Sequence, residues 1–500
     1  MQTVEQYTIF ELNLSGPSEG NPYQQVNLCA RFTDGTQVIS MQGFYKGDGH
    51  YAIRFMPSRA GMWHYETQSN AGEMDGQSGQ FRCAPHTGQN HGPVYLAKDV
   101  LGAEGKDRFG EALPYSFCYA DGTRFLPFGT TCYAWIQQPA AVQEETLKNL
   151  GQSPFNKIRM CIFPKYYTYN TEDPERYPFP GDRQDGFDFT RFDELFFERL
   201  DQQIAALDDL GIEADIILLH PYDRWGFSQM TKEQDIFYLS YVVRRYSAYK
   251  NVWWSLANEY DLMPQKSLAD WDCYAHIVME NDPYHHLRSI HNCIPFFDYR
   301  KDWITHVSVQ RVDVYKTAEI ISDLRETYQK PVIMDEAGYE GNIGIGWGAL
   351  TGEELTRRFW EGCLRGGFLS HGETFVDRGP YIWWSHGGML YGDSPRRIAF
   401  LQEIMMDAPE DCVQLKLTPE NHEANWDVTC FQDEQYRLYY YGFFRMAFRE
   451  FVLPEDEAWQ VERIDTWNMT VETLPGTYSG KIRIDMPNRQ YMAVRMKRIR

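Results

Sequence analysis

Residues 252–259 read VWWSLANE, and this stretch decides how the rest of the chain is interpreted. Its first six residues are apolar or small, as in a strand buried on both faces, and it ends abruptly in Asn258 and Glu259. A second apolar stretch, PVIMDE over residues 331–336, ends in Glu336 in the same way. Active sites of (β/α)8 barrels lie at the C-terminal ends of the strands. We therefore expect the two glutamates to meet at one end of such a barrel.

Strand and helix signals alternate between about residue 115 and residue 405, which is the pattern of a parallel α/β sheet. Eight strand ends can be placed, and eight strands fit a closed (β/α)8 TIM barrel. They fall at Trp135, Phe163, His220, Glu259, Asn292, Gln310, Glu336 and Glu373. Helix starts are marked by capping boxes at 231–234 and 351–354. Ser394-Pro395 places a cap before a proline at the first helical position.

Short strands with alternating apolar and polar residues flank this region. Residues 1–90 carry them between turn signals, as in the run 37–45, and predict a small antiparallel β-sandwich. The stretch 84–92 is typical of a linker. Short strands return near the C-terminus, most clearly at 436–441 and 491–496. We expect three domains: an N-terminal β-sandwich over 1–90, a catalytic barrel over 91–408, and a C-terminal β-sandwich-like domain over 409–500.

Composition excludes several classes of partner. The net charge of −22 argues against nucleic acid and against an anionic membrane. No apolar run reaches spanning length, and the N-terminus lacks the basic start and apolar run of a signal peptide. The ten cysteines are scattered without a CxxC pair, which favours free thiols and a cytoplasmic location. The oligomeric state stays open, with a homo-oligomer among the alternatives.

Glu259 and Glu336 are the candidate catalytic residues. Glycoside hydrolysis needs two carboxyl groups that face each other across the sugar, about 5 Å apart in retaining enzymes. Burial at the end of an apolar strand raises the pKa of a carboxyl group, as the acid role of Glu259 requires. Glu336, as nucleophile, must stay ionised and should lie among hydrogen-bond donors. Asp335 is its rival, but neighbouring strand residues point to opposite sides, so only one should enter the pocket. A structural, salt-bridged carboxylate is the competing interpretation for each.

Seven further residues are candidates for binding the substrate, because they end a predicted strand, lie within one, or follow the last one. They are Asn258, Arg159, His220, His291, Gln310, Trp383 and Trp384. Asn258 could bond the sugar 2-hydroxyl and Arg159 could orient the nucleophile, or form a structural ion pair. For the histidines and tryptophans, packing in the core competes with a place in the pocket. Glu373, near His371, is the reserve carboxylate.

The chain resembles the clan A glycoside hydrolases, in which an Asn-Glu pair follows strand four and a second Glu ends strand seven. It resembles the apiosidase-like group more closely, in which a β-sandwich precedes the barrel and a β domain often follows it. LPFGTTCYAW at 126–135 is similar to that group's first barrel strand, and SRAGMWHY at 58–65 to its sandwich motif. The resemblance implies a retaining glycosidase. The clan's tyrosine or histidine of strand six has no match, because Gln310-Arg311 stands there.

The expected function is hydrolysis of an O-glycosidic bond in an oligosaccharide or plant-type glycan by double displacement, with a carbohydrate as partner. A catalytically inactive carbohydrate-binding barrel is the alternative, and it would typically lack one of the two glutamates. A metal-dependent barrel hydrolase would need an HxH pair after strand one, where TTCYAW stands. No metal and no cofactor are expected.

Overall fold

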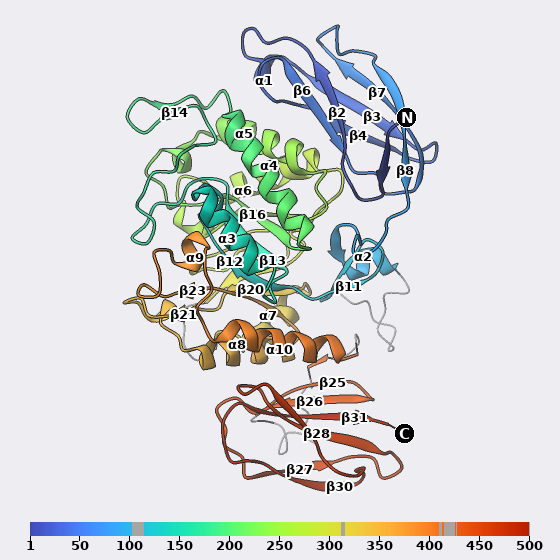
Figure 1. Ribbon diagram of the computed structural model, residues 1–500, viewed down its shortest axis with the longest axis vertical. Helices are drawn as coiled ribbons and strands as arrows, with labels where there is room; N and C mark the ends of the chain where they lie inside the picture. The colour runs from blue at the N-terminus through green and yellow to red at the C-terminus, as the bar shows by residue number, and fades with distance from the viewer. Residues whose placement is uncertain (103–114, 312–315, 410–412, 415–425, 427, 500) are drawn as a thin grey trace.

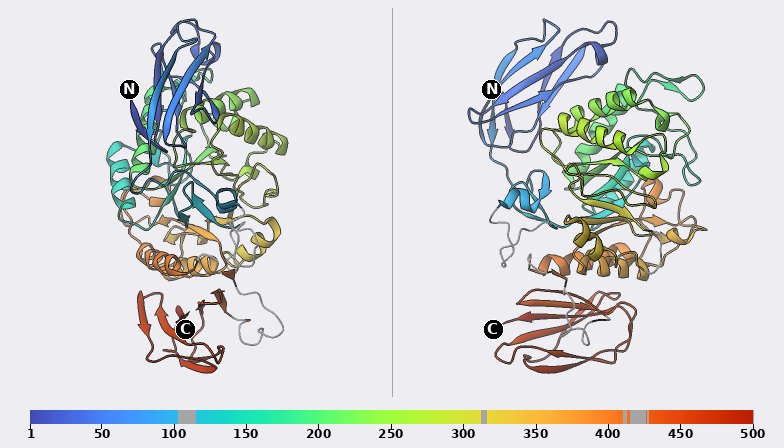
Figure 2. Two further views of the ribbon diagram at one scale, coloured as in Figure 1. Left: turned by 90° about the vertical axis from the view of Figure 1, so that its right-hand side faces the viewer. Right: turned by 180° about the vertical axis from the view of Figure 1, so that it is seen from behind.

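The computed structural model describes residues 1–102, 115–311, 316–409, 413–414, 426 and 428–499. A β-sandwich, a central barrel and a second β domain follow one another along its longest axis (Figure 1). The same order is seen from the side and from behind (Figure 2).

The central sheet consists of parallel strands in the order β18-β17-β16-β13-β12-β22-β20-β19. Their bounds are β12 Phe128–Thr131, β13 Lys157–Cys161, β16 Glu213–Leu219, β17 Val252–Ala257, β18 Arg288–Ser289, β19 Val307–Gln310, β20 Val332–Glu336 and β22 Phe368–His371. A parallel bridge between His291 and Ser308 joins the two ends of the series. The sheet therefore closes on itself, and the predicted (β/α)8 barrel is confirmed.

Helices cover the outside of the barrel (Figure 1). Their bounds are α3 Ala140–Leu150, α4 Glu194–Asp209, α5 Lys232–Tyr246, α6 Leu268–Asn281, α7 Ile321–Tyr328, α8 Gly352–Leu364 and α10 Ser394–Asp407. The predicted capping box at the start of α5 is complete, with Thr231 and Gln234 bonding each other's backbone. At α8 only half of the box forms: Thr351 accepts from the Glu354 N–H, while the Glu354 carboxylate pairs with Arg357 instead.

The start of α10 differs from the expectation. Asp393 precedes the helix and Ser394 is its first residue, so the predicted cap is displaced by one position. The Ser394 hydroxyl does not cap the helix, because it donates to the Glu340 carboxylate at 2.6 Å.

Six of the eight predicted barrel strands end one to four residues earlier than expected, and only β19 and β20 end at the predicted residue. β12 ends at Thr131, and Trp135 begins a short 3-10 helix over Trp135–Gln137. β22 ends at His371, and Glu373 lies in β23 (Glu373–Thr374), which pairs with β21 (Glu340–Gly341). The chain leaves the barrel sheet at Gly372, where a Cβ atom would lie 2.5 Å from the Tyr339 ring. The loops after β20 and β22 are thereby joined at the C-terminal end of the barrel.

A small antiparallel sheet closes the opposite end of the barrel. It comprises β9 (Val94–Leu96), β10 (Phe117–Tyr119) and β11 (Arg124–Phe125). Its apolar side chains pack with Trp253, Ile333 and Phe368, which lie at the N-terminal ends of their strands. This leaves the C-terminal end of the barrel for a pocket.

The N-terminal body has two sheets, β1-β8-β7-β3-β4 and β2-β6-β5. The bounds are β1 Thr3–Glu5, β2 Phe10–Ser15, β3 Leu28–Thr33, β4 Val38–Gln42, β5 Phe44–Tyr45, β6 His50–Phe55, β7 Gly61–Ser69 and β8 Ser78–Ala84, with the short helix α1 at Pro22–Gln25. The run 37–45 divides at Gly43, so β4 and β5 belong to different sheets. Arg54 joins this body to the barrel through an ion pair of 2.6 Å with Asp201 on α4.

The C-terminal body has a larger sheet, β24-β25-β26-β31-β28-β29, and the pair β27-β30. The bounds are β24 Val413–Gln414, β25 Thr429–Gln432, β26 Tyr436–Tyr440, β27 Phe448–Val452, β28 Trp459–Asp465, β29 Thr470–Thr473, β30 Lys481–Asp485 and β31 Met492–Arg498. Figure 1 shows α8 and α10 between the barrel and this body. The rings of Trp360 on α8 and Tyr440 stack at 5.3 Å.

Two further findings concern the parts of the chain that the structure describes. None of their nine cysteines forms a disulfide. Their helices are all too short or too polar to cross a lipid bilayer.

Candidate active site

A pocket of about 310 Å³ lies at the C-terminal end of the barrel, and both predicted catalytic glutamates line it. The side chains that line it come from loops after several strands. They include Lys165, Tyr167, Tyr169, Tyr222, Glu259, Cys293, Gln310, Arg311, Glu336, Tyr339, Trp347 and Trp384. This lining combines charged groups with a surplus of aromatic rings.

Glu259 follows β17 in a backbone conformation that is rare for a residue with a side chain. Its φ of +53° lies in the left-handed region, which costs on the order of 1–3 kcal/mol and is concentrated at functional sites. Gln310 Nε2 donates to Glu259 Oε1 at 2.7 Å, and Asn258 Nδ2 donates to Oε2 at 3.2 Å. Both carboxylate oxygens are thus held by amides from β19 and from the residue before.

Glu336 is the last residue of β20. The Tyr133 hydroxyl donates to Glu336 Oε1 in a short hydrogen bond. Arg159 Nη1 lies 3.9 Å from the same oxygen, and His291 Nε2 lies 4.0 Å from it. Glu336 is therefore surrounded by donors and by a cation, as a nucleophile requires.

The protonation of Glu336 nevertheless differs from the expectation of a carboxylate that is fully ionised at rest. Burial, and then the charge of Glu259, raise the pKa of Glu336 to about 7, against the lowering influence of Arg159 and Lys165. Carboxyl groups that share one cavity cannot ionise independently of each other. Glu336 is therefore only partly ionised near neutral pH in the free enzyme.

Arg159 on β13 organises the groups around this pair. Its guanidinium is fully buried and donates to Asn258 Oδ1 and to the Tyr133 hydroxyl oxygen, both at 3.2 Å. Because Asn258 Oδ1 faces these donors, its Nδ2 is turned toward Glu259. Burial and the charge of Glu336 raise the pKa of Tyr133 well above its usual value, so the phenol stays protonated and can donate.

Asp335, the rival of Glu336, does not line the pocket. It is fully buried and accepts from Lys157 Nζ at 2.9 Å and from the hydroxyls of Ser308 and Ser370. Although burial opposes its charge, Lys157 and Arg159 hold the pKa of Asp335 well below its usual range. Asp335 therefore belongs to the ion-pair network inside the barrel.

The two predicted histidines are buried and do not line the pocket. Burial and the charge of Arg159 lower the pKa of His291, which is therefore neutral beside Glu336. His220 Nε2 lies 3.1 Å from the Phe163 carbonyl oxygen, and burial and Lys165 lower its pKa to about 4. Both histidines pack behind the residues that face the pocket.

The two predicted tryptophans have different surroundings, although they are neighbours in the short helix α9 (Trp383–His386). Trp384 lines the pocket, with its ring centroid 5.1 Å from that of Trp347. Trp383 does not line it, and its Nε1 donates to Thr130 Oγ1 at 2.8 Å inside the barrel.

Sequence reasoning missed Tyr133, Lys165 and Tyr222. Lys165 Nζ lies 3.4 Å from the centroid of the Tyr133 ring and 4.3 Å from that of Tyr222, and burial lowers the pKa of Lys165. A signal for Lys165 was available, because it lies two residues after the predicted apolar end of strand two at Phe163. The reserve carboxylate Glu373 lies outside the pocket lining, in a buried group with Glu340 and His371.

Comparisons with known proteins agree with this architecture. The family described as "Apiosidase-like, catalytic domain" matches residues 114–388. Two domains of unknown function, DUF5060 and DUF5605, match residues 3–70 and 426–497. No curated protein matches the chain.

Solved structures match the chain over most or all of its length. A crystal structure from Bacteroides vulgatus ATCC 8482, described provisionally as a glycoside hydrolase, has 36% identity and a TM-score of 0.91 and covers 100% of both chains. A family 5 glycoside hydrolase from the same organism has 14% identity and a TM-score of 0.62, covering 82% of this chain and 95% of its own. The second likeness concerns the fold alone. The chain belongs to the apiosidase-like family, and it is a glycosidase with a (β/α)8 barrel.

Proposed function

We propose that this glycosidase hydrolyses an O-glycosidic bond of an oligosaccharide or plant-type glycan by double displacement, with Glu336 as nucleophile and Glu259 as general acid and base. One observation carries the proposal: both glutamates line one pocket at the C-terminal end of the barrel, and each accepts a hydrogen bond from a distant part of the chain. Arg159 and Lys165 favour the ionised form of Glu336 that the nucleophile role needs.

In the first step, a Glu336 carboxylate oxygen attacks the anomeric carbon of the sugar. Glu259 gives its proton to the glycosidic oxygen as the carbon–oxygen bond breaks, and a glycosyl ester of Glu336 forms. Gln310 and Asn258 hold the Glu259 carboxyl in one orientation during this transfer. Asn258 was expected to contact the sugar 2-hydroxyl, but it is fully buried behind the pocket lining and acts here through Glu259.

In the second step, Glu259 removes a proton from water, and the water oxygen attacks the anomeric carbon. The ester bond breaks and Glu336 leaves as a carboxylate, so the sugar is released with its original configuration. Tyr133 donates to the oxygen on which the negative charge returns, and the nearby Arg159 favours that charge. Preorganised donors of this kind stabilise charge as it develops.

The pocket wall supports a carbohydrate as substrate. Tyr167, Tyr169, Trp347 and Trp384 present aromatic rings to the pocket, and sugar rings stack on such faces through their C–H groups. Lys165 also lines the pocket, and its charge interacts with those of both glutamates. An inactive carbohydrate-binding barrel would dispense with one of the two glutamates, and both are present.

A panel of aryl glycosides tests this proposal with the wild type and Glu259→Gln. NMR of the first product formed should show the anomeric configuration of the substrate, and the variant should lose most of the turnover. An inverted first product would contradict double displacement. A variant with wild-type turnover would exclude Glu259 from the reaction.

A further inference from the structure

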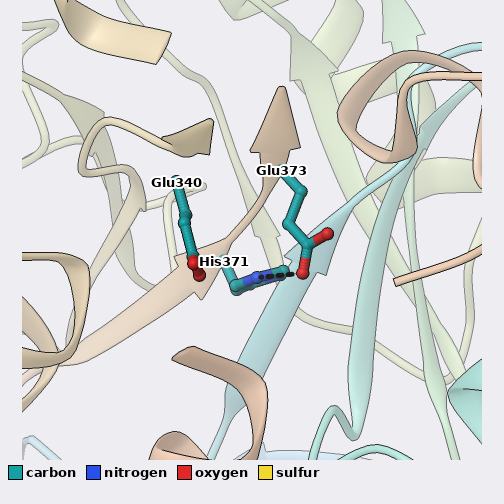
Figure 3. A group of neighbouring side chains, drawn as sticks. All are labelled: Glu340, His371 and Glu373. Carbon is teal, nitrogen blue, oxygen red and sulfur yellow. Dashed lines mark ion pairs between the residues drawn. The ribbon is translucent and has the colours of Figure 1, made fainter. Parts of the chain in front are cut away.

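A second group of ionisable side chains is buried near the end of strand eight, outside the pocket lining. Glu340 on β21, His371 at the end of β22 and Glu373 on β23 each offer one ligand atom, and these atoms lie within 4.8 Å of one another. Figure 3 shows the His371 ring lying between the two carboxyl groups. The pairing of β21 with β23 places Glu340 directly opposite Glu373.

The charges of this group are not balanced by the residues around it. Glu340, His371 and Glu373 are 4%, 0% and 1% exposed. Within the described parts of the chain, no lysine or arginine forms an ion pair with either carboxylate, and only His371 lies near Glu373, at 3.6 Å. Burying a carboxylate without a compensating charge is costly. A cation bound among these side chains would offset that cost.

The hydrogen bonds of His371 leave one ring nitrogen available. The Thr130 hydroxyl donates to the His371 carbonyl oxygen at 3.3 Å, and its oxygen lies 3.2 Å from His371 Nδ1. When the hydroxyl hydrogen is used in this way, the Thr130 oxygen can accept from Nδ1–H, and that tautomer leaves a lone pair on Nε2. His371 Nε2 and Glu373 Oε1 are both buried, and neither has a hydrogen-bond partner among the described residues. Two buried polar atoms without hydrogen-bond partners thus lie 3.6 Å apart.

Hydrogen bonds from backbone N–H groups hold the carboxylates of Glu340 and Glu373 in place. The Glu340 carboxylate accepts from the backbone N–H groups of Asp393 and Ser394, at 2.7 and 2.9 Å. Glu373 Oε2 accepts from the Tyr391 N–H at 2.7 Å, which leaves Oε1 for another partner. A Cβ atom at position 392 would lie 2.5 Å from Glu340 Oε2 and 2.6 Å from Glu373 Oε1, so glycine permits this close approach. Hydrogen bonds of this kind orient the ligands of metal sites.

We propose that Glu340, His371 and Glu373 bind a divalent transition-metal ion of the zinc type. One imidazole nitrogen and two carboxylate groups suit Zn²⁺ or Mn²⁺, whereas Ca²⁺ takes oxygen ligands only. The site is independent of the proposed reaction, because none of its three residues lines the pocket.

The place of the ion in the fold indicates its role. It joins the loop after β20 to the loop after β22, and these loops carry Tyr339, Trp347 and Trp384 to the pocket. The ion would brace this aromatic wall and take no part in bond cleavage.

Metal content and thermal stability test the proposal in the full-length protein. Wild type stripped with a chelator should take up about one equivalent of Zn²⁺ more than Glu373→Gln, and its Tm should rise with added Zn²⁺. Glu361→Gln is the matched control, because it removes a buried carboxylate that pairs with Arg365 away from the group. This control should bind as much Zn²⁺ as the wild type.

Co²⁺ separates this site from the cysteines, which could also bind Zn²⁺. Bound to imidazole and carboxylate, Co²⁺ should give visible d–d absorption without thiolate charge-transfer bands, and His371→Gln should remove that absorption. Equal metal binding by the wild type, Glu373→Gln and His371→Gln would overturn the proposal. So would a stripped wild type whose Tm is unchanged by added Zn²⁺.

Discussion

Two pairs of glutamates lie at the same end of the barrel in different surroundings. Glu259 and Glu336 line the pocket and accept from side-chain donors. Glu340 and Glu373 are closed off from the pocket, accept mainly from backbone N–H groups, and share one imidazole. Side-chain donors can adjust when a carboxyl group gains or loses a proton, so they suit a pair whose charge changes during a reaction. Backbone donors suit a pair whose charge is constant. Access and donor type, and not the number of carboxylates, distinguish the proposed catalytic pair.

Removing the nucleophile should give the largest effect. Glu336→Ala should lower turnover by about 10⁴-fold or more, because no covalent intermediate can form. Glu373→Gln removes a carboxylate charge from the other pair and should lose far less activity. The measurement is kcat/KM on an aryl glycoside, with circular dichroism to check folding. Equal losses in the two variants would erase the distinction between the pairs.

Glu259→Ala should have a smaller effect that depends on the substrate. Removal of a general acid costs about 10²–10⁴-fold, and most for poor leaving groups, because these need protonation as the bond breaks. Activated aryl glycosides should still form the glycosyl-enzyme, and added azide should restore breakdown and give a glycosyl azide of retained configuration. If azide instead gives a retained product with Glu336→Ala, the two roles are reversed.

Tyr133→Phe should have an intermediate effect. It removes a hydrogen bond to a charged group, worth about 1.5–3 kcal/mol, which corresponds to roughly 10–100-fold in kcat/KM. Tyr167→Phe is the matched control, because the Tyr167 hydroxyl lies in the same region but donates to Ser385. If the two variants are equally active, the Tyr133 hydroxyl has no role in holding Glu336.

The smallest expected effects are shifts in pH dependence. Glu259 raises the pKa of Glu336 and Lys165 lowers it, so Glu259→Gln should lower that pKa from about 7 and Lys165→Met should raise it. The rate at which a 2-fluoroglycoside labels the enzyme follows the ionised nucleophile. The pH at which labelling begins should therefore be lower in Glu259→Gln and higher in Lys165→Met than in the wild type. Shifts in the same direction in both variants would contradict the charge coupling described above.

Much of the fold could be predicted from the sequence, because long apolar strands that end in polar residues carry a local signal. The strands that end near Glu259 and Glu336 are of this kind, and so is the alternation that defines the barrel. The β21-β23 pair could not be predicted, because each strand has two residues and the pairing depends on the packing of Gly372 against Tyr339.

The site was predictable only where a residue follows a strand directly. Gln310 reaches Glu259 because it ends β19, whereas Tyr133 reaches Glu336 through the turn after β12, which has no local signal. Trp383 and Trp384 are neighbours in the sequence, so the sequence does not distinguish them. Only the direction of each side chain in α9 places Trp384 in the pocket and Trp383 in the core. Glu340 has no strand signal at all, so its group with His371 and Glu373 emerges only in three dimensions.

Trapping of the covalent intermediate tests the central claim most directly. The enzyme would be incubated with a 2-deoxy-2-fluoro glycoside of the sugar that it cleaves in the aryl glycoside panel, digested, and mapped by mass spectrometry. The account predicts one added glycosyl group, attached to Glu336. A label on Glu259, Asp335 or Glu373, or no label while the enzyme still turns over the parent substrate, would contradict it.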